Sequence, residues 1–128
     1  MSTEDTCCSI APYFKVEEGR MDEFKALTAR FVEATGTEEG ALYYGFSYNG
    51  DVAYCREGYI NGESLLAHLD NVGALVQEAL TMSSLDRIEI HGPESEVAKL
   101  REPLAGLNPA FSYLSLGSAD RISVSDWS

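Results

Sequence analysis

Three side chains that can exchange or share protons lie close together in the middle of the chain: Glu57, Tyr59 and His68. Glu57 and Tyr59 stand near the end of a predicted strand, a turn is expected over Asn61-Gly62, and His68 falls on the helix that follows. Imidazole titrates near neutral pH, so His68 is the best candidate for a base. Glu57 can orient or charge-balance this base, and Tyr59 can hydrogen-bond a substrate oxygen. The stretch predicts a site for proton transfer.

Each of these residues also has a structural interpretation. A single His on a short amphipathic helix is commonly a structural or surface group. Glu57 can pair with Arg56 or Arg87, or accept a backbone hydrogen bond, and Tyr59 can belong to the core. Both interpretations stay open at the level of the sequence.

The chain has 128 residues, the length of one domain. Its 21 acidic residues outnumber 9 basic ones, which gives a formal charge of -12. A surface this negative repels phosphate backbones and anionic lipids, so the composition argues against nucleic-acid and membrane partners. It leaves small-molecule sites and protein partners open.

The three cysteines predict reduced thiols. Cys7 and Cys8 are adjacent, which is poor geometry for pairing with each other, and Cys55 lies inside a strand pattern. An odd count without regular spacing is typical of a cytoplasmic protein. No apolar run of about 18 residues is present, and the first six residues carry two acids and no basic group. We therefore expect a cytoplasmic chain without a secretory signal.

Hydrophobic periodicity divides the chain into alternating strands and helices. Pro12 predicts an open edge or a bulge in the first strand, Asn49-Gly50 predicts a hairpin turn, and Gly36 is expected in a left-handed helix cap. Leu85 is expected to face away from Ile88. The predicted strands are 9–16, 41–48, 51–59, 84–91 and 111–116, and the predicted helices are 20–35, 63–70, about 72–81 and 94–104.

The order strand, helix, strand, strand, helix, strand, helix is that of a ferredoxin-like α+β domain, an antiparallel sheet with helices on one face. We expect a flexible lead over 1–8, the domain over 9–116, and a tail over 117–128 that is mobile or lies on a neighbouring subunit. Apolar and aromatic residues occur on both faces of the hairpin strands. A second copy of the chain would bury the open face, so a homodimer is predicted.

Aromatic residues of the predicted strands can line a pocket for a flat ring. With only His68 and His91, and with no spaced set of Cys or carboxylates, the sequence predicts no metal site. It also offers no Gly-rich phosphate loop and no nucleophile in a recognisable motif. The residues expected to line the pocket are Tyr13, Phe14, Tyr44 and Phe46.

The order of elements and the stretch 56–68 resemble the antibiotic biosynthesis monooxygenase superfamily, whose members are small dimeric ferredoxin-like barrels. The pattern of that family is a Glu near the end of the third strand, an aromatic residue two positions on, and a His on the next helix. Here these are Glu57, Tyr59 and His68. The resemblance covers roughly residues 9–92. It implies a dimeric barrel that oxidises a small aromatic, quinol or polyketide-like substrate with dioxygen and uses no metal or organic cofactor.

The chain departs from the family pattern at two positions. Members of the family often have Trp where Tyr59 stands and a second His where Gly73 stands. The haem-degrading branch is a poorer match, because its first strand carries an Asn where this chain offers Tyr13 and Phe14. Two other hypotheses therefore accompany the monooxygenase: a binding or sensing protein without turnover, and an isomerase or lyase that needs a proton shuttle but no oxygen.

Overall fold

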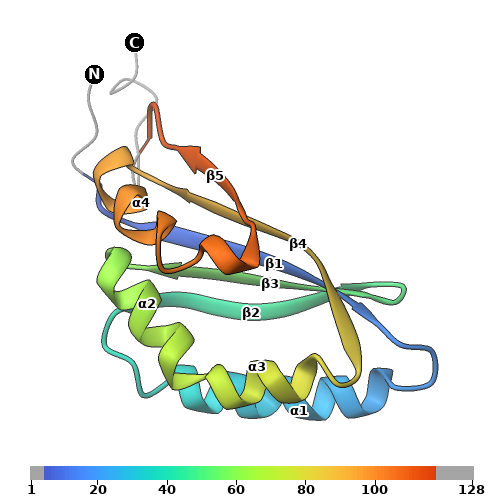
Figure 1. Ribbon diagram of the computed structural model, residues 1–128. Helices are drawn as coiled ribbons and strands as arrows, with labels where there is room; N and C mark the ends of the chain where they lie inside the picture. The colour runs from blue at the N-terminus through green and yellow to red at the C-terminus, as the bar shows by residue number, and fades with distance from the viewer. Residues whose placement is uncertain (1–4, 118–128) are drawn as a thin grey trace.

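Five strands form one mixed sheet in the computed structural model, which describes residues 5–117 (Figure 1). The strand order is β2-β3-β1-β4-β5, with antiparallel pairs throughout except for β5, which runs parallel to β4. The strands are β1 Cys8–Val16, β2 Ala41–Asn49, β3 Val52–Tyr59, β4 Ser83–Gly92 and β5 Ala110–Tyr113. This is the predicted ferredoxin-like α+β order, extended at one edge by β5.

The helices cover one face of the sheet (Figure 1). They are α1 Met21–Thr35, α2 Gly62–Asn71, α3 Gly73–Ala79, α4 Glu94–Arg101 and the 3-10 turn η1 Ala105–Leu107. In α1 the apolar side chains of Phe24, Leu27 and Phe31 recur at helical spacing and are buried against the sheet. Together with α3 this helix covers one half of the core, while α2 and α4 cover the other half.

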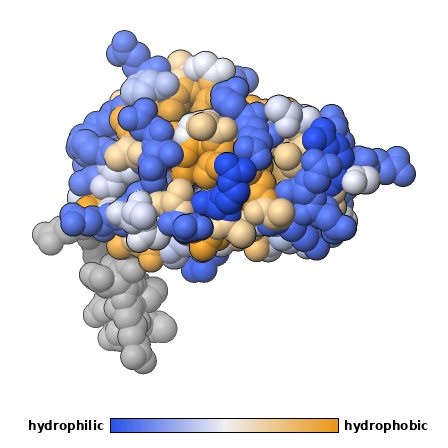
Figure 2. Space-filling model, turned by 90° about the horizontal axis from the view of Figure 1, so that it is seen from below, coloured by the Kyte–Doolittle hydropathy of each residue, from blue (hydrophilic) through white to orange (hydrophobic). Residues whose placement is uncertain are grey.

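The break between the second and third helices falls at Val72, one residue beyond the predicted break at Asn71. Seen from below, where α1 and α3 lie, apolar residues gather near the middle of the face between hydrophilic ones (Figure 2). Among the helices of residues 5–117, none is long and apolar enough to cross a membrane.

Two predicted turns have different outcomes. The hairpin is confirmed, but its turn lies one residue beyond Asn49-Gly50, because Asn49 pairs with Val52 and the two loop residues are Gly50, with φ +60°, and Asp51. Asn61 instead has an extended backbone, and its side-chain Oδ1 accepts a hydrogen bond from the backbone N–H of Ser64 at 2.8 Å. The expected turn over Asn61-Gly62 is therefore the capped start of α2.

A strand irregularity places Leu85 on a face other than the one predicted, and a second irregularity affects Leu42. Opposite β1, Phe14 pairs with Leu85 and Tyr13 pairs with Arg87, so one residue of β4 is bulged out. Leu85 consequently faces the helices on the same side as Ile88, and the expected opposition of these two residues was wrong. A similar shift in β2 leaves Leu42 half exposed, away from the side of Tyr44.

Two further expectations are corrected by the backbone. Pro12 lies in a central strand, between β3 and β4, and the register shift comes just after it, so the bulge is present but the open edge is not. Gly36 has φ -61° and continues the right-handed geometry of α1. The left-handed cap predicted at Gly36 is therefore wrong.

The expected lead over 1–8 and the expected tail over 117–128 lie at the two ends of the chain. The first strand already begins at Cys8, inside the expected lead. Residues 1–4 and 118–128 lie outside the described part, and with them almost all of the segment expected to form the tail.

Candidate functional site

Glu57 and Tyr59 project from the end of β3 toward the helices. Alternation along a strand puts residues two apart on the same face, and both side chains are buried, with Glu57 only 4% exposed. The Tyr59 hydroxyl donates a hydrogen bond to Oε1 of Glu57 at 2.6 Å. The alternation of β3 thus holds the Tyr59 hydroxyl, a hydrogen-bond donor, beside the buried carboxyl of Glu57.

The start of α2 sets the position of His68. The backbone N–H of Gly62 donates to Oε1 of Glu96 on α4 at 3.0 Å, and a Cβ added to Gly62 would lie 3.0 Å from the Glu96 carbonyl oxygen. The helix therefore begins in close contact with α4. His68 lies in its last turn on the same buried side as Leu65 and is 2% exposed.

The imidazole of His68 stands between two carboxyl groups. Its Nδ1 is 2.9 Å from Oε2 of Glu38, and its Nε2 is 3.3 Å from Oε1 of Glu57. The rings of Tyr44 and Tyr59 pack on the imidazole with centroid distances of 5.2 and 4.9 Å. If Nδ1 carries the proton that it donates to Glu38, the lone pair of Nε2 faces Glu57.

Glu38 was not among the residues singled out in the sequence. It lies in the loop between α1 and β2, and its side chain is 13% exposed. The Asn71 amide donates to Glu38 Oε2 at 2.9 Å and to the Ala34 carbonyl at 3.1 Å, which holds the carboxylate against the imidazole. Glu38 and Tyr44 also line a surface groove of about 250 Å³. The carboxylate thus links buried His68 to the exterior.

Burial shifts the proton affinities of the two central groups in opposite directions. Burial raises the pKa of Glu57 to about 7, and the charge of Glu38 adds to the rise, while hydrogen bonds from Tyr59 and Cys55 oppose it. Burial lowers the pKa of His68, against the hydrogen bond and charge of Glu38. Burial thus favours the neutral form of both groups, an unprotonated imidazole beside a protonated carboxyl.

Glu57 and His68 line a largely enclosed cavity of about 110 Å³ between the sheet and the helices. Phe14, Tyr44 and Phe46, which were expected to line a pocket, do line this cavity. Tyr13 does not, because it lies on the opposite face of β1, with its ring 4.9 Å from that of Tyr54. The structure thus brings three of the four aromatic residues to the cavity.

The same geometry removes one structural interpretation of Glu57. Arg56 points to the opposite face of β3, where its guanidinium stacks on the ring of Tyr43, and Arg87 pairs with Glu89. Glu57 is therefore partnered by Tyr59 and His68, and by neither arginine.

Comparison with solved structures places the chain in a family. MupZ from Pseudomonas fluorescens is 42% identical to it, with a TM-score of 0.89 over 94% of each chain. The chain belongs to the MupZ family.

More distant structures have the same fold. A candidate antibiotic biosynthesis monooxygenase from Nitrosomonas europaea is 14% identical, with a TM-score of 0.65 over 73% of this chain and 96% of the other. Another from Caulobacter crescentus is 18% identical, with a TM-score of 0.61 over 67% and 88%. No family model and no curated protein matches the chain. The fold of this MupZ relative is that of the antibiotic biosynthesis monooxygenase superfamily, as the sequence pattern indicated.

Residues 5–117 of this chain contain no evident metal centre. Within residues 5–117, no group of three or more His, Cys, Asp or Glu side chains is arranged to hold a metal ion. Cys55 lies at the cavity beside Glu57, where burial raises the pKa of its thiol and keeps it protonated. The groups in the cavity that can exchange a proton near neutral pH are therefore His68 and Glu57.

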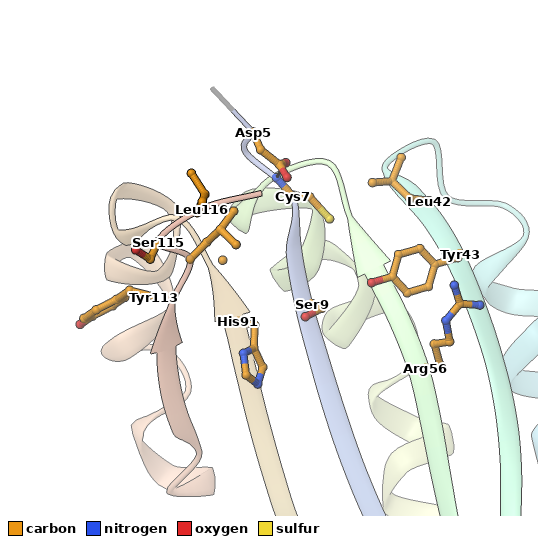
Figure 3. Close-up of a pocket in the computed structure, with 12 residues that line it drawn as sticks. Asp5, Cys7, Ser9, Leu42, Tyr43, Arg56, His91, Tyr113, Ser115 and Leu116 are labelled. Carbon is orange, nitrogen blue, oxygen red and sulfur yellow. Dashed lines mark hydrogen bonds between the residues drawn. The ribbon is translucent and has the colours of Figure 1, made fainter. Parts of the chain in front are cut away.

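A wide cleft of about 840 Å³ lies on the other face of the sheet. Figure 3 shows Tyr43 and Arg56 on one side of it, His91 and Tyr113 on the other, and Ser9 between them on β1. The ring of Tyr43 lies directly over Gly58, where an added Cβ would be 2.4 Å from it. This open face carries no helix, and the sheet separates it from the cavity of Glu57 and His68 (Figure 1).

Proposed function

We propose that this protein catalyses a proton-dependent oxidation of a small aromatic, quinol or polyketide-like molecule by dioxygen, without a metal or organic cofactor. The observation that carries the proposal is the buried row Glu38, His68 and Glu57 at the wall of an apolar cavity. Such a row can take a proton from a bound substrate and hold the charge that results.

The chemistry assigned to the row begins with loss of a substrate proton. Nε2 of His68 takes the proton, and Glu38 stabilises the imidazolium that forms. The substrate anion then transfers one electron to dioxygen, and the resulting radicals combine to form a C–O bond. For a substrate CH₂ group, loss of one water from the peroxide leaves a carbonyl, so that CH₂ and O₂ give C=O and H₂O. Protonated Glu57 is placed to return a proton to the departing oxygen.

Oxygen consumption tests this proposal. Rates would be measured with a panel of quinols and anthrones for the wild type, His68→Ala and His91→Ala. His91 is the matched control, since it is exposed and lies on the other face of the sheet. We expect a loss of at least 100-fold for His68→Ala and no change for His91→Ala, since general base catalysis is typically worth 10²–10⁴-fold. Equal rates in all three proteins would exclude His68 as the base.

A second candidate is an isomerase or lyase. The observation that favours it is the 3.3 Å separation of Nε2 of His68 and Oε1 of Glu57, which puts a base and an acid at the same end of the cavity. Proton transfer between two substrate positions needs this pair and no oxygen. Turnover that is equal with and without air would favour this candidate over the oxidation.

The binding or sensing hypothesis follows from the departures at Tyr59 and Gly73 and needs the cavity but no turnover. A ligand that raises the melting temperature and is recovered unchanged after incubation in air would favour it. Conversion of the bound ligand would count against it.

We also propose that the open face joins two copies of the chain. This face carries Tyr13, Tyr43 and Tyr54, which leaves aromatic surface without a helix to cover it. The open face also carries Arg56 and Arg87. These basic side chains reduce the local repulsion between two strongly acidic chains that meet there.

A further inference from the structure

The cavity of Glu57 and His68 carries its acid and base toward β2 and β3 and only hydrocarbon on the side of β4. Its acid and base come from β3 and α2, together with the thiol of Cys55. On the β4 side the lining residues are Leu85 and Ile88. Because β1 lies between β3 and β4, the two ends are separated by two strand spacings, about 10 Å. The cavity therefore runs across the sheet, with its reactive groups beside the rings of Phe31, Tyr44 and Phe46 and with aliphatic side chains toward β4.

The hydrocarbon end opens to the surface. Leu80, which follows α3, and Leu107 in η1 both line the cavity, yet they are 38% and 46% exposed. Gln77 on α3 is also an exposed lining residue. Side chains that contact a cavity and are exposed as well mark its opening. The mouth lies between α3 and η1.

The volume limits what can be wholly enclosed. Pockets that enclose drug-sized ligands measure about 300–1,000 Å³, whereas this cavity measures about 110 Å³. A larger molecule must extend beyond the cavity, and the mouth at Leu80 and Leu107 lies at the end away from the acid and base. A flexible hydrocarbon chain can follow this route.

We propose that the substrate is an amphiphile with an oxygen-bearing head, such as a phenol, and an unbranched hydrocarbon chain. The head lies at Glu57 and His68, and the chain crosses the sheet and emerges between Leu80 and Leu107. The head assignment rests on the proposed function, but the chain assignment rests on the cavity and its mouth.

Binding of 4-alkylphenols tests the chain assignment without turnover. Dissociation constants would be measured by calorimetry under nitrogen for ethyl, butyl, hexyl, octyl and decyl phenols. Transfer of a methylene from water to an apolar site strengthens binding by about fourfold. We expect each early two-carbon step to tighten binding about tenfold or more, and the gain to fall below about twofold per step once the chain leaves the mouth. A dissociation constant that does not depend on chain length would overturn the proposal.

Variants at the mouth separate this effect from general apolar binding. In Leu107→Glu a carboxylate stands beside the emerging chain, so octylphenol should bind at least about tenfold more weakly while ethylphenol is unaffected. Leu116→Glu is the control, because Leu116 is 51% exposed and lines the cleft on the other face. Equal weakening by both variants, or weakening of ethylphenol as much as octylphenol by Leu107→Glu, would refute the assignment of the mouth.

His68→Ala distinguishes failure of the two proposals. This variant keeps the hydrocarbon end, so it should keep the dependence on chain length even where oxygen consumption is lost. A chain-length dependence in a wild type that consumes no oxygen would support the cavity assignment and reject the oxidation. Oxygen consumption without any dependence of binding on chain length would support the oxidation and reject the cavity assignment.

Discussion

Glu57 is the residue whose titration should be visible in the stability of the whole chain. Its pKa of about 7 in the folded protein lies above the value of about 4.3 for an unfolded chain. Between these values the folded state holds a proton that the unfolded state has released. Stability from this group is therefore full at low pH and is lost as the pH rises from about 4.3 to about 7, by at most about 4 kcal/mol.

Glu57→Gln removes this titration and keeps an acceptor for the Tyr59 hydroxyl. Urea unfolding at pH 5 and pH 8 should show a stability gain over the wild type that is larger at pH 8. The lowered pKa of His68 acts in the opposite direction, with stability lost as the pH falls below about 6.5, but His68 is present in both proteins. A difference between the proteins that is the same at both pH values would mean that Glu57 is already ionised at pH 5.

Glu38 should control the proton affinity of His68. Its hydrogen bond and charge raise the pKa of the imidazole against the effect of burial. Glu38→Gln keeps an oxygen acceptor but removes the charge, so the pKa of His68 should fall further, as measured by NMR titration of the ring nitrogens. Glu39→Gln is the control, since the neighbouring acid is exposed. An unchanged His68 pKa in Glu38→Gln would remove Glu38 from its positioning role.

The contrast between Glu57 and Glu38 shows what the sequence could predict at this scale. Glu57, Tyr59 and His68 lie on consecutive elements, so strand alternation and helix periodicity were enough to bring them together. Glu38 reaches the same imidazole from a loop 30 residues earlier in the chain. Its neighbours in sequence form no pattern that marks it, and only the packing of α1 against α2 reveals the contact.

At the scale of elements, the start of α2 depends on a residue without a side chain. Ala favours helices over Gly by about 1 kcal/mol, yet a Cβ on Gly62 would lie 3.0 Å from the carbonyl oxygen of Glu96. We expect Gly62→Ala to destabilise the protein by about 1–2 kcal/mol, because α2 and α4 must separate. At Gly73, the start of α3, an added Cβ meets nothing within 4 Å.

Gly73→Ala is therefore the matched comparison, and it should stabilise the protein by about 0.5 kcal/mol by restricting the unfolded chain. Both variants would be compared by urea unfolding. If the two substitutions changed the free energy of unfolding in the same direction, the close contact with α4 would not be what fixes the start of α2. The shift of α2 would also move His68, so Gly62→Ala should lower any activity at the site more than Gly73→Ala does.

The elements themselves followed from periodicity, while their irregularities did not. A bulge in β4 puts Leu85 on the same face as Ile88, although simple alternation predicted the opposite. The parallel addition of β5 to β4 was also not specified by a local pattern, since pairing partners far apart in sequence depend on the whole sheet.

At the scale of the whole molecule, the charge of the chain should shape the proposed dimer. Each copy has a formal charge of -12, so two copies repel at long range. Salt screens that repulsion, with a Debye length of about 10 Å at 0.1 M. The proposed contact is the aromatic open face, whose burial is little affected by moderate salt. The dimer should therefore dissociate less as sodium chloride increases from 20 to 300 mM.

Light scattering coupled to size exclusion would measure the mass at micromolar concentration in this series. Tyr54→Glu places a further carboxylate at the centre of the open face, beside Tyr13, and should give the monomer mass at every salt concentration. Val32→Glu is the control, because Val32 is exposed on α1, on the helical side. A dimer that survives Tyr54→Glu but not Val32→Glu would place the interface on the helices, where it would cover the groove beside Glu38 instead of the open sheet.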